Sequence, residues 1–232
     1  MDIQKLNTKQ IKEIINKILL KSHLLPFITA IRILKVLEID YGHFKSVYRW
    51  ESVDKFGKPI PWFSYSAIEY LKSLDLSEMS VFEYGSGGST IFWANHASNV
   101  TSTENNAKWF KKVINSLKNY KNAKIILSEN KAEYVNAINT SKIRYDIVVI
   151  DGEYRYQCSQ VALKKIKNNG LIILDNSERY SKIKKYFRNH NLIEIEFTGL
   201  GPINPYTSTT SFFITKDFNP RFVNKIKHPG SI

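Results

Sequence analysis

The sequence of 232 residues contains a single cysteine, Cys158, and no long uninterrupted apolar run. One thiol excludes an internal disulfide and fits a reducing compartment, and we expect Cys158 to be a buried structural residue. The longest apolar stretch, residues 24–37, is interrupted by Pro26, Arg32 and Lys35, whereas a membrane span needs roughly 18 apolar residues. The N-terminus is not typical of a signal peptide, because lysines break up its apolar stretches. We therefore expect a cytoplasmic protein.

Acidic residues are also scarce, with 21 Asp and Glu against 34 Lys and Arg, which gives a formal net charge of +13. A strongly basic protein suits nucleic acid, an anionic membrane surface or a negatively charged substrate as a partner. The lysines are spread evenly, however, and abundant asparagine and isoleucine accompany them, as a bias in genomic base composition would produce. We favour an acidic acceptor or the inner face of a membrane over nucleic acid.

The first part of the chain predicts a helical extension. Residues 9–39 form one or two amphipathic helices in this interpretation, because Ile11, Ile15 and Ile18 recur at helical spacing, and Pro26 marks a break or a new start. Such a segment with interleaved lysines suits a membrane surface. It equally suits a lid or a dimer face packed on the main domain, which is the interpretation that we prefer. We divide the chain into an extension or lid, residues 1–58, and a main domain, residues 59–232, with an irregular connector over 41–61.

From residue 61 onward, strand and helix patterns alternate. The expected strands are 80–84, 99–104, 123–128, 145–151, 170–176, 192–197 and 210–216. The expected helices are 61–74, 89–97, 106–120, 131–140, 157–168 and 178–189, the fifth of them capped by Asn169 and Gly170. Alternation of this kind predicts an α/β fold, a doubly wound, Rossmann-like and mostly parallel sheet. The last two strands lack a helix between them, which predicts a reversed last strand.

The stretch VFEYGSGGST, residues 81–90, combines three glycines with hydroxyl residues directly after an expected strand. A phosphate-binding P-loop needs a lysine after its glycines, and none is present here. The dinucleotide fingerprint places a third glycine where this chain has Thr90. An acid, Glu104, closes the next strand, at the position where nucleoside-binding folds hold ribose hydroxyls.

This glycine turn, followed by an acid at the end of the second strand, resembles the class I S-adenosylmethionine-dependent methyltransferases. The resemblance implies that the backbone of the turn approaches the methionine part of the cofactor, that Glu104 accepts from the ribose, and that the adenine lies after the third strand. The residues that we assign to cofactor binding are Glu83, Gly85, Ser86, Gly87, Ser89, Thr90, Glu104, Ser128, Glu129 and Asp151.

Asp151 ends the fourth expected strand, and Asp175 and Asn176 end the fifth. Neighbouring parallel strands bring their carboxyl ends together, and oxygen ligands of this kind suit Mg²⁺ or another divalent cation. The pattern resembles the divalent-metal-dependent O-methyltransferases of the catechol and caffeoyl-CoA type, which implies that Asp151, Asp175 and Asn176 hold a metal. The surrounding sequence looks closer to bacterial surface-glycan methyltransferases. Without a metal, Asp151 serves as the general base and Arg155 grips an anionic group of the acceptor.

We therefore expect an S-adenosylmethionine-dependent O-methyltransferase that acts on a hydroxyl of a small polar molecule or a glycan sugar, with or without help from a metal. The alternatives are an RNA methyltransferase and a catalytically inactive membrane-surface binding protein of the same fold. A homo-oligomer is compatible with the sequence. Trp62 and Tyr65 suit two roles equally, closing over the cofactor or packing in the core. We interpret the loop at 199–211 as part of the acceptor pocket, with an ordinary connecting loop as the alternative.

Overall fold

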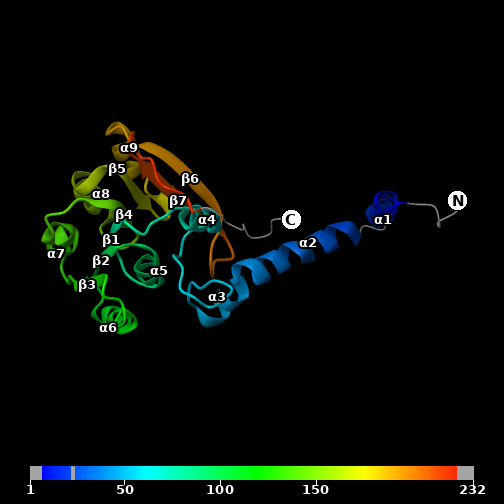
Figure 1. Cartoon of the computed structure of the whole chain (residues 1–232), viewed down its shortest axis with the longest axis horizontal. Helices are drawn as coiled ribbons and strands as arrows, with labels where there is room; N and C mark the ends of the chain where they lie inside the picture. The colour runs from blue at the N-terminus through cyan, green and yellow to red at the C-terminus, as the bar shows by residue number, and fades with distance from the viewer. Residues whose placement is uncertain (1–6, 22–23, 224–232) are drawn as a thin grey trace.

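The computed structural model describes residues 7–21 and 24–223. Residues 1–6 and 22–23 of the predicted extension and residues 224–232 of the predicted main domain lie outside the described residues. A seven-stranded sheet in the order β3-β2-β1-β4-β5-β7-β6 crosses the main domain (Figure 1). The strands are β1 (Ser80–Tyr84), β2 (Asn99–Glu104), β3 (Ala123–Leu127), β4 (Tyr145–Ile150), β5 (Ile166–Leu174), β6 (Ile193–Leu200) and β7 (Thr207–Ile214).

The predicted doubly wound sheet with a reversed last strand is confirmed. Strands β1 to β5 pair in parallel, whereas β7 runs antiparallel to both of its neighbours, β5 and β6. Phe212 and Phe213 explain the inner position of β7, because these adjacent side chains point to opposite faces and both are fully buried. The edge strand β6 instead exposes Ile193 and Ile195.

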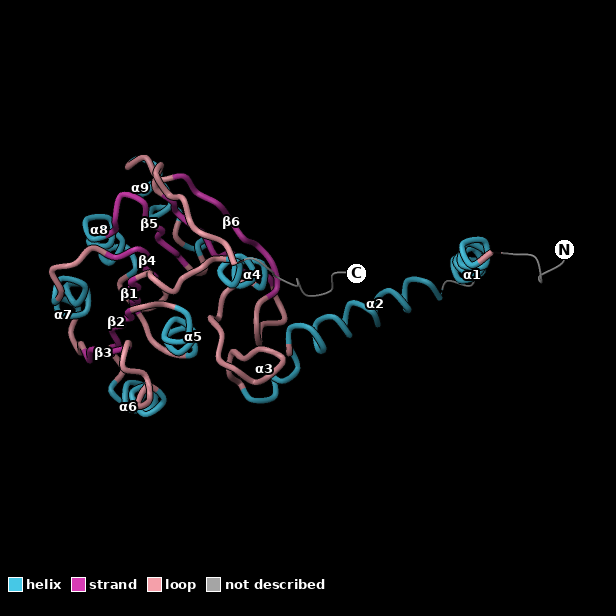
Figure 2. Tube along the Cα trace, viewed as in Figure 1, coloured by secondary structure: helices cyan, strands magenta, loops and turns pink. Residues whose placement is uncertain are grey.

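Helices cover both faces of the sheet (Figure 2). On one side lie α4 (Tyr65–Ser73), α5 (Gly88–His96) and α6 (Ala107–Ser116), and on the other lie α7 (Lys131–Asn136), α8 (Arg155–Lys165) and α9 (Ser181–Asn189). Successive side chains of a strand point to opposite faces of the sheet, so apolar residues on both faces form one core under each helix layer. In β4, for example, Ile147 and Val149 pack toward α4 and α5, whereas Val148 and Ile150 pack toward α8 and α9. Cys158 is buried in the second core, as expected.

Two elements differ from the sequence-based expectation. The expected connector over residues 41–61 contains a helix, α3 (His43–Arg49), whose buried Ser46 exchanges hydrogen bonds with the backbone of Val53. The helix expected over 157–168 ends at Lys165, so Asn169 and Gly170 do not cap it. Ile166 instead begins β5, because it pairs with Tyr145 of β4 and becomes buried there.

The N-terminal helices α1 (Thr8–Lys21) and α2 (Leu24–Val36) confirm the predicted helical extension, and α2 continues through a π-helical turn at Leu37–Tyr41. They project from the main domain (Figure 1), and no residue of either helix is buried in the part of the chain that the structure describes. The preferred interpretation, a lid or dimer face packed on the main domain, is therefore not supported for α1 and α2. Among the described residues, no single helix has both the length and the composition to cross a membrane, although α1 and α2, bent by 106° at the break between them, meet that criterion as a pair.

Substitution at Gly152 tests the close packing of the strand ends. A Cβ atom there would lie 2.0 Å from the hydroxyl of the buried Tyr134 and 2.9 Å from the backbone nitrogen of Gly85. We expect Gly152→Ala to lower the free energy of unfolding by about 1–3 kcal/mol. Gly199→Ala, whose nearest neighbour lies 3.9 Å away, is the matched control and should be neutral or slightly stabilising. Chemical denaturation of both variants measures the difference, and equal effects would contradict this account.

Candidate active site

The strand order reverses between β1 and β4, and doubly wound sheets bind ligands in the crevice at the carboxyl ends of the strands on either side of such a point. Gly85 follows β1 with a φ of +98°, a left-handed backbone conformation that favours glycine. Its Cα position is so close to the chain after β4 that an added Cβ would lie 3.2 Å from the nitrogen of Gly152. Two glycine backbones, at Gly85 and Gly152, therefore lie in close contact at the point where the strand order reverses.

A cleft of about 280 Å³ opens beside this junction. Its walls come from the connector between α3 and α4, from the glycine turn and the start of α5, from α6, and from the loops that follow β4 and β6. The lining residues include Trp50, Trp62, Ser86, Gly87, Gly88, Ser89, Trp109, Lys112, Asp151 and Ile203. The connector packs tightly on the turn, since a Cβ on Gly88 would lie 3.2 Å from the carbonyl oxygen of Ile60.

Glu83 lies beneath the glycine turn rather than on the cleft wall. Its carboxylate is buried and accepts hydrogen bonds from the Thr90 hydroxyl and from the Trp93 indole, both on α5. The same Thr90 hydroxyl accepts from the backbone N–H of Gly87 at 3.0 Å. Burial raises the pKa of Glu83 to about 7, despite these hydrogen bonds. Glu83 and Thr90, which we assigned to cofactor contact, thus lie on the side of the turn that faces α5, where they hold the backbone of Gly87 in place.

Glu104 points toward the glycine turn, as the sequence predicts. Its carboxylate accepts from the Ser86 hydroxyl at 2.8 Å and from the backbone N–H groups of Asn105 and Asn106 at 3.0 and 2.9 Å. The side chain is almost fully buried, so a ribose reaches it only by taking the place of the Ser86 hydroxyl. The Glu104 carboxylate thus already accepts three hydrogen bonds and, like Gly85, it is not among the residues that line the cleft in the described part of the chain.

The remaining cofactor candidates lie at different depths. Ser89 is on the cleft wall. Ser128 is buried after β3, where its hydroxyl accepts from Thr103 and its N–H donates to the carbonyl of Glu104. Glu129 is exposed. Neither Ser128 nor Glu129 belongs to the cleft wall in the part of the chain that the structure describes.

Trp109 is a cleft residue that the sequence reading missed. Its indole N–H donates to the carbonyl of Ser86 at 2.7 Å, and its ring lies over Gly87. The Lys112 ammonium lies 4.8 Å from this ring and pairs with Glu51 across the cleft at 3.1 Å. The sequence does show a tryptophan in the first turn of the helix that follows Glu104, and this position could have indicated it.

Asp151 and Arg155 lie together at the ends of β4 and α8. The Arg155 guanidinium donates to the backbone carbonyls of Asp151, Gly152 and Asp175 and to the Asp151 carboxylate at 3.2 Å. Its face also covers the ring of Tyr180. These contacts do not support the prediction that Arg155 grips the acceptor, because the guanidinium is nearly buried and holds the ends of β4 and β5 together. Arg155 is a positioning residue.

The Asp151 carboxylate lies on the cleft wall, and only one of its oxygens accepts from Arg155 among the described residues. Burial raises the pKa of Asp151 to about 6, and the neighbouring guanidinium opposes that rise. Asp151 also contributes to the raised pKa of Glu83. The cleft therefore presents a carboxylate whose pKa is close to neutrality, which suits it to proton transfer.

The predicted metal site is not formed. The carboxylate of Asp175 is buried and accepts from the Thr210 hydroxyl at 2.7 Å, away from the cleft, and Asn176 adopts a left-handed φ of 49° that starts a short 3₁₀ turn. The Arg155 cation already lies between Asp151 and the Asp175 backbone, where it would repel a divalent ion. Within residues 7–21 and 24–223, no three His, Cys, Asp or Glu side chains gather where they could hold a metal ion. The donor set does not fit the metal.

Of the two aromatic residues considered for closing over the cofactor, only Trp62 lines the cleft in the described part of the chain. Trp62 lies on the cleft wall with its ring edge toward Trp50, at 6.4 Å between ring centroids. Tyr65 is instead buried in the core, where its hydroxyl lies 3.1 Å from the His43 ring, so it does not close over the cleft. From the loop predicted at 199–211, Ile203 reaches the cleft. Much of that range is strand, because β6 runs to Leu200 and β7 begins at Thr207.

Comparison with known proteins identifies the fold. No protein-family model matches the chain, and no curated protein is similar to it in sequence. An rRNA methylase from Streptococcus thermophilus is similar in structure over 61% of this chain and 90% of its own, with a TM-score of 0.50 and 12% identity. A precorrin-6y C5,15-methyltransferase from Geobacter metallireducens covers 65% of this chain and 87% of its own, with a TM-score of 0.52 and 12% identity. The chain has the class I methyltransferase fold.

The buried Glu83 predicts a specific pH dependence of stability. Its folded-state pKa is raised, so its contribution is fully present below the ordinary carboxyl pKa and is lost as the pH rises through about 7. Between about pH 5 and about pH 8, we expect the wild-type protein to lose ~3 kcal/mol more stability than Glu83→Gln does. Urea denaturation across this range measures it, with the exposed Glu129→Gln as control. If the free energies of unfolding of the wild type and of Glu83→Gln changed with pH in parallel, the raised pKa of Glu83 would be refuted.

Proposed function

We propose that this protein is an S-adenosylmethionine-dependent methyltransferase that methylates a hydroxyl group. The observation that carries the proposal is the position of the Asp151 carboxylate. It lies on the same cleft wall as the glycine turn, and its raised pKa of about 6 suits a general base at neutral pH. The class I methyltransferase fold supports the cofactor, and Asp151 supports the choice of a hydroxyl as acceptor.

The residues of the turn fit the cofactor. The bare backbone at Gly85 and Gly87 allows close approach of the methionine part, and Glu104 offers the carboxylate that two ribose hydroxyls need. Bound S-adenosylmethionine supplies a methyl group on a positively charged sulfur, which leaves as a neutral thioether. Trp109, at the edge of the turn, offers an aromatic face beside the nucleoside. Glu83 and Thr90 keep the turn in place during the reaction.

Asp151 then acts on the acceptor. Its carboxylate would take the proton from the acceptor hydroxyl and hold it, so that this oxygen could accept the methyl group that the bound cofactor would supply. Arg155 keeps Asp151 aimed along the cleft and prevents its pKa from rising further. The step needs no divalent cation, in agreement with the donor set at Asp151 and Asp175.

The walls of the cleft support a ring-shaped polar acceptor. Trp50 and Trp62, whose ring planes are 84° apart, line the cleft together with Ile203. Indole faces pack on the apolar face of a flat ring, while the ring edge remains free for hydrogen bonds. A glycan sugar or another small polar molecule fits this arrangement, and the net charge of +13 favours one with an acidic group.

Calorimetry with S-adenosylhomocysteine tests the cofactor. We expect saturable binding to the wild-type protein and an affinity lower by about 10- to 100-fold in Glu104→Gln, because each hydrogen bond from a ribose hydroxyl to a charged acceptor contributes about 1.5–3 kcal/mol. Glu78→Gln, on an exposed side chain before β1 and therefore at the opposite end of the strands, is the control and should bind as the wild type does. Absence of binding to the folded wild-type protein would refute the assignment of the cofactor.

Transfer of labelled methyl from S-adenosylmethionine tests the base. We expect Asp151→Asn to lower the rate by about 10²- to 10⁴-fold while S-adenosylhomocysteine binding is retained. The wild-type rate should rise with pH through about 6, where Asp151 loses its proton, and a chelator should leave it unchanged. Suitable acceptor pools are a polar small-molecule extract, a glycan fraction and total RNA. Label that enters only RNA, or full activity in Asp151→Asn, would overturn the proposal.

A further inference from the structure

Helix α2 is apolar on all sides and has no cover in the described chain. Its sequence, LLPFITAIRILKV, contains only Arg32, Lys35 and Thr29 as polar residues, and its apolar side chains point in every direction. Phe27 is 68% exposed and Ile33 58% exposed. A helix that is apolar all round normally lies inside a protein core or in lipid. The described part of this chain provides no such core for α2, so its apolar surroundings come from outside.

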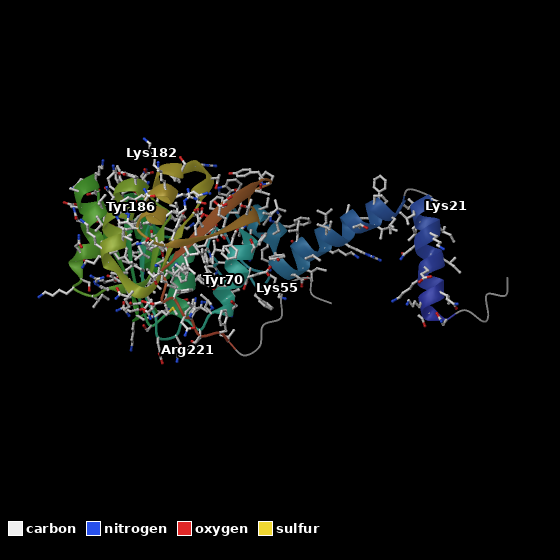
Figure 3. All side chains as sticks on the ribbon, turned by 90° about the horizontal axis from the view of Figure 1, so that it is seen from above. Lys21, Lys55, Tyr70, Lys182, Tyr186 and Arg221 are labelled. Carbon is white, nitrogen blue, oxygen red and sulfur yellow. The ribbon has the colours of Figure 1, made fainter. Side chains whose placement is uncertain are left out.

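Helix α1 has a different pattern, with one apolar and one basic face. Ile11, Ile15 and Ile18 recur at helical spacing and are exposed together. Lys9, Lys12, Lys17 and Lys21 lie among the remaining residues of the helix, together with the polar Gln10, Glu13 and Asn16. A basic amphipathic helix of this kind is typical of segments that lie in the interface of a membrane, with the apolar face in the acyl region and the lysines at the headgroups. Figure 3 shows α1 and α2 extending away from the main domain, with side chains on all sides of each helix and Lys21 on α1.

Exposed aromatic rings continue this surface at the base of the extension. Tyr48 on α3 is 92% exposed, Trp50 just after it is 70% exposed, and Phe56 in the following turn is 74% exposed. Cations lie among these rings, and the Lys55 ammonium is 5.3 Å from the centre of the Phe56 ring. Aromatic rings and lysines together are enriched at the level of lipid headgroups.

The charge of the extension decides between a second copy of the chain and a membrane. Glu13 is the only acidic residue in the sequences of α1 and α2. Their basic residues are Lys9, Lys12, Lys17, Lys21, Arg32 and Lys35. Pairing two copies through these helices would bring like charges together, whereas an anionic lipid surface attracts each of them.

We propose that the N-terminal arm, which we define as α1, α2, α3 and the turn at 54–58, docks on an anionic lipid bilayer. The apolar residues of α1 and α2 enter the outer acyl region, the lysines contact the headgroups, and Tyr48 and Phe56 lie at the interface. The main domain remains in water. This proposal rests on the arm and is independent of the methyltransferase assignment.

Co-sedimentation with vesicles tests it without cofactor or acceptor. We expect the full chain to bind vesicles that contain phosphatidylserine at least about tenfold more tightly than vesicles of phosphatidylcholine alone, and to be released by high salt. Equal binding to both lipids, or no binding to either, would overturn the proposal. Binding that survives both high salt and alkaline carbonate would also overturn it, because it would indicate that the bent pair α1 and α2 inserts across the bilayer.

Matched variants assign the binding surface. Ile15→Glu and Phe27→Glu place a charge on exposed apolar positions of the arm, and we expect each to weaken binding by about tenfold or more. Ile143→Glu and Ile193→Glu make the same change at exposed positions of the main domain and should bind as the wild type does. Circular dichroism of all four confirms folding. Equal loss in arm and control variants would refute the surface, and so would a lipid-independent dimer that Phe27→Glu dissociates, detected by light scattering.

Discussion

The site depends on one ionic and hydrogen-bonded contact, that of the Arg155 guanidinium with the ends of β4 and β5. Parallel strands end in backbone carbonyl groups that no neighbouring strand can bond. Here the Arg155 guanidinium donates hydrogen bonds to three of them, the carbonyls of Asp151, Gly152 and Asp175. The fork also supplies the positive charge that two buried carboxylates require. It fixes the direction of Asp151, and it occupies the space that a metal ion would need.

Most of the fold could be predicted from the sequence because each layer leaves a local signature. The β-branched run at 147–150, within the strand expected over 145–151, is apolar at every position because both faces of the sheet are covered. The boundary between α8 and β5 could not be predicted in this way. The residues around Ile166 continue a helical apolar spacing, and only the pairing with Tyr145, far along the chain, places Ile166 in the sheet. Long-range pairing overrides local propensity there.

The same distinction applies to the site. The chain could reveal that Gly85 and Glu104 end neighbouring strands, and therefore that they meet, because strand ends are local features. It could not reveal the direction of Asp175, which turns inward to Thr210, a residue 35 positions away on the reversed strand. Nor could it reveal that Glu83 lies behind the turn, since that depends on how α5 seats its indole and hydroxyl groups on β1.

The connector from Trp50 to Trp62 begins where α3 ends, so one continuous stretch of backbone serves both the extension and the mouth of the cleft. A contact that holds the extension in place would therefore also hold the Trp50–Trp62 wall of the cleft that contains Asp151. On a bilayer, molecules confined to the plane of the lipid would meet this cleft by two-dimensional diffusion, and an amphiphilic acceptor would gain access over one that is freely dissolved.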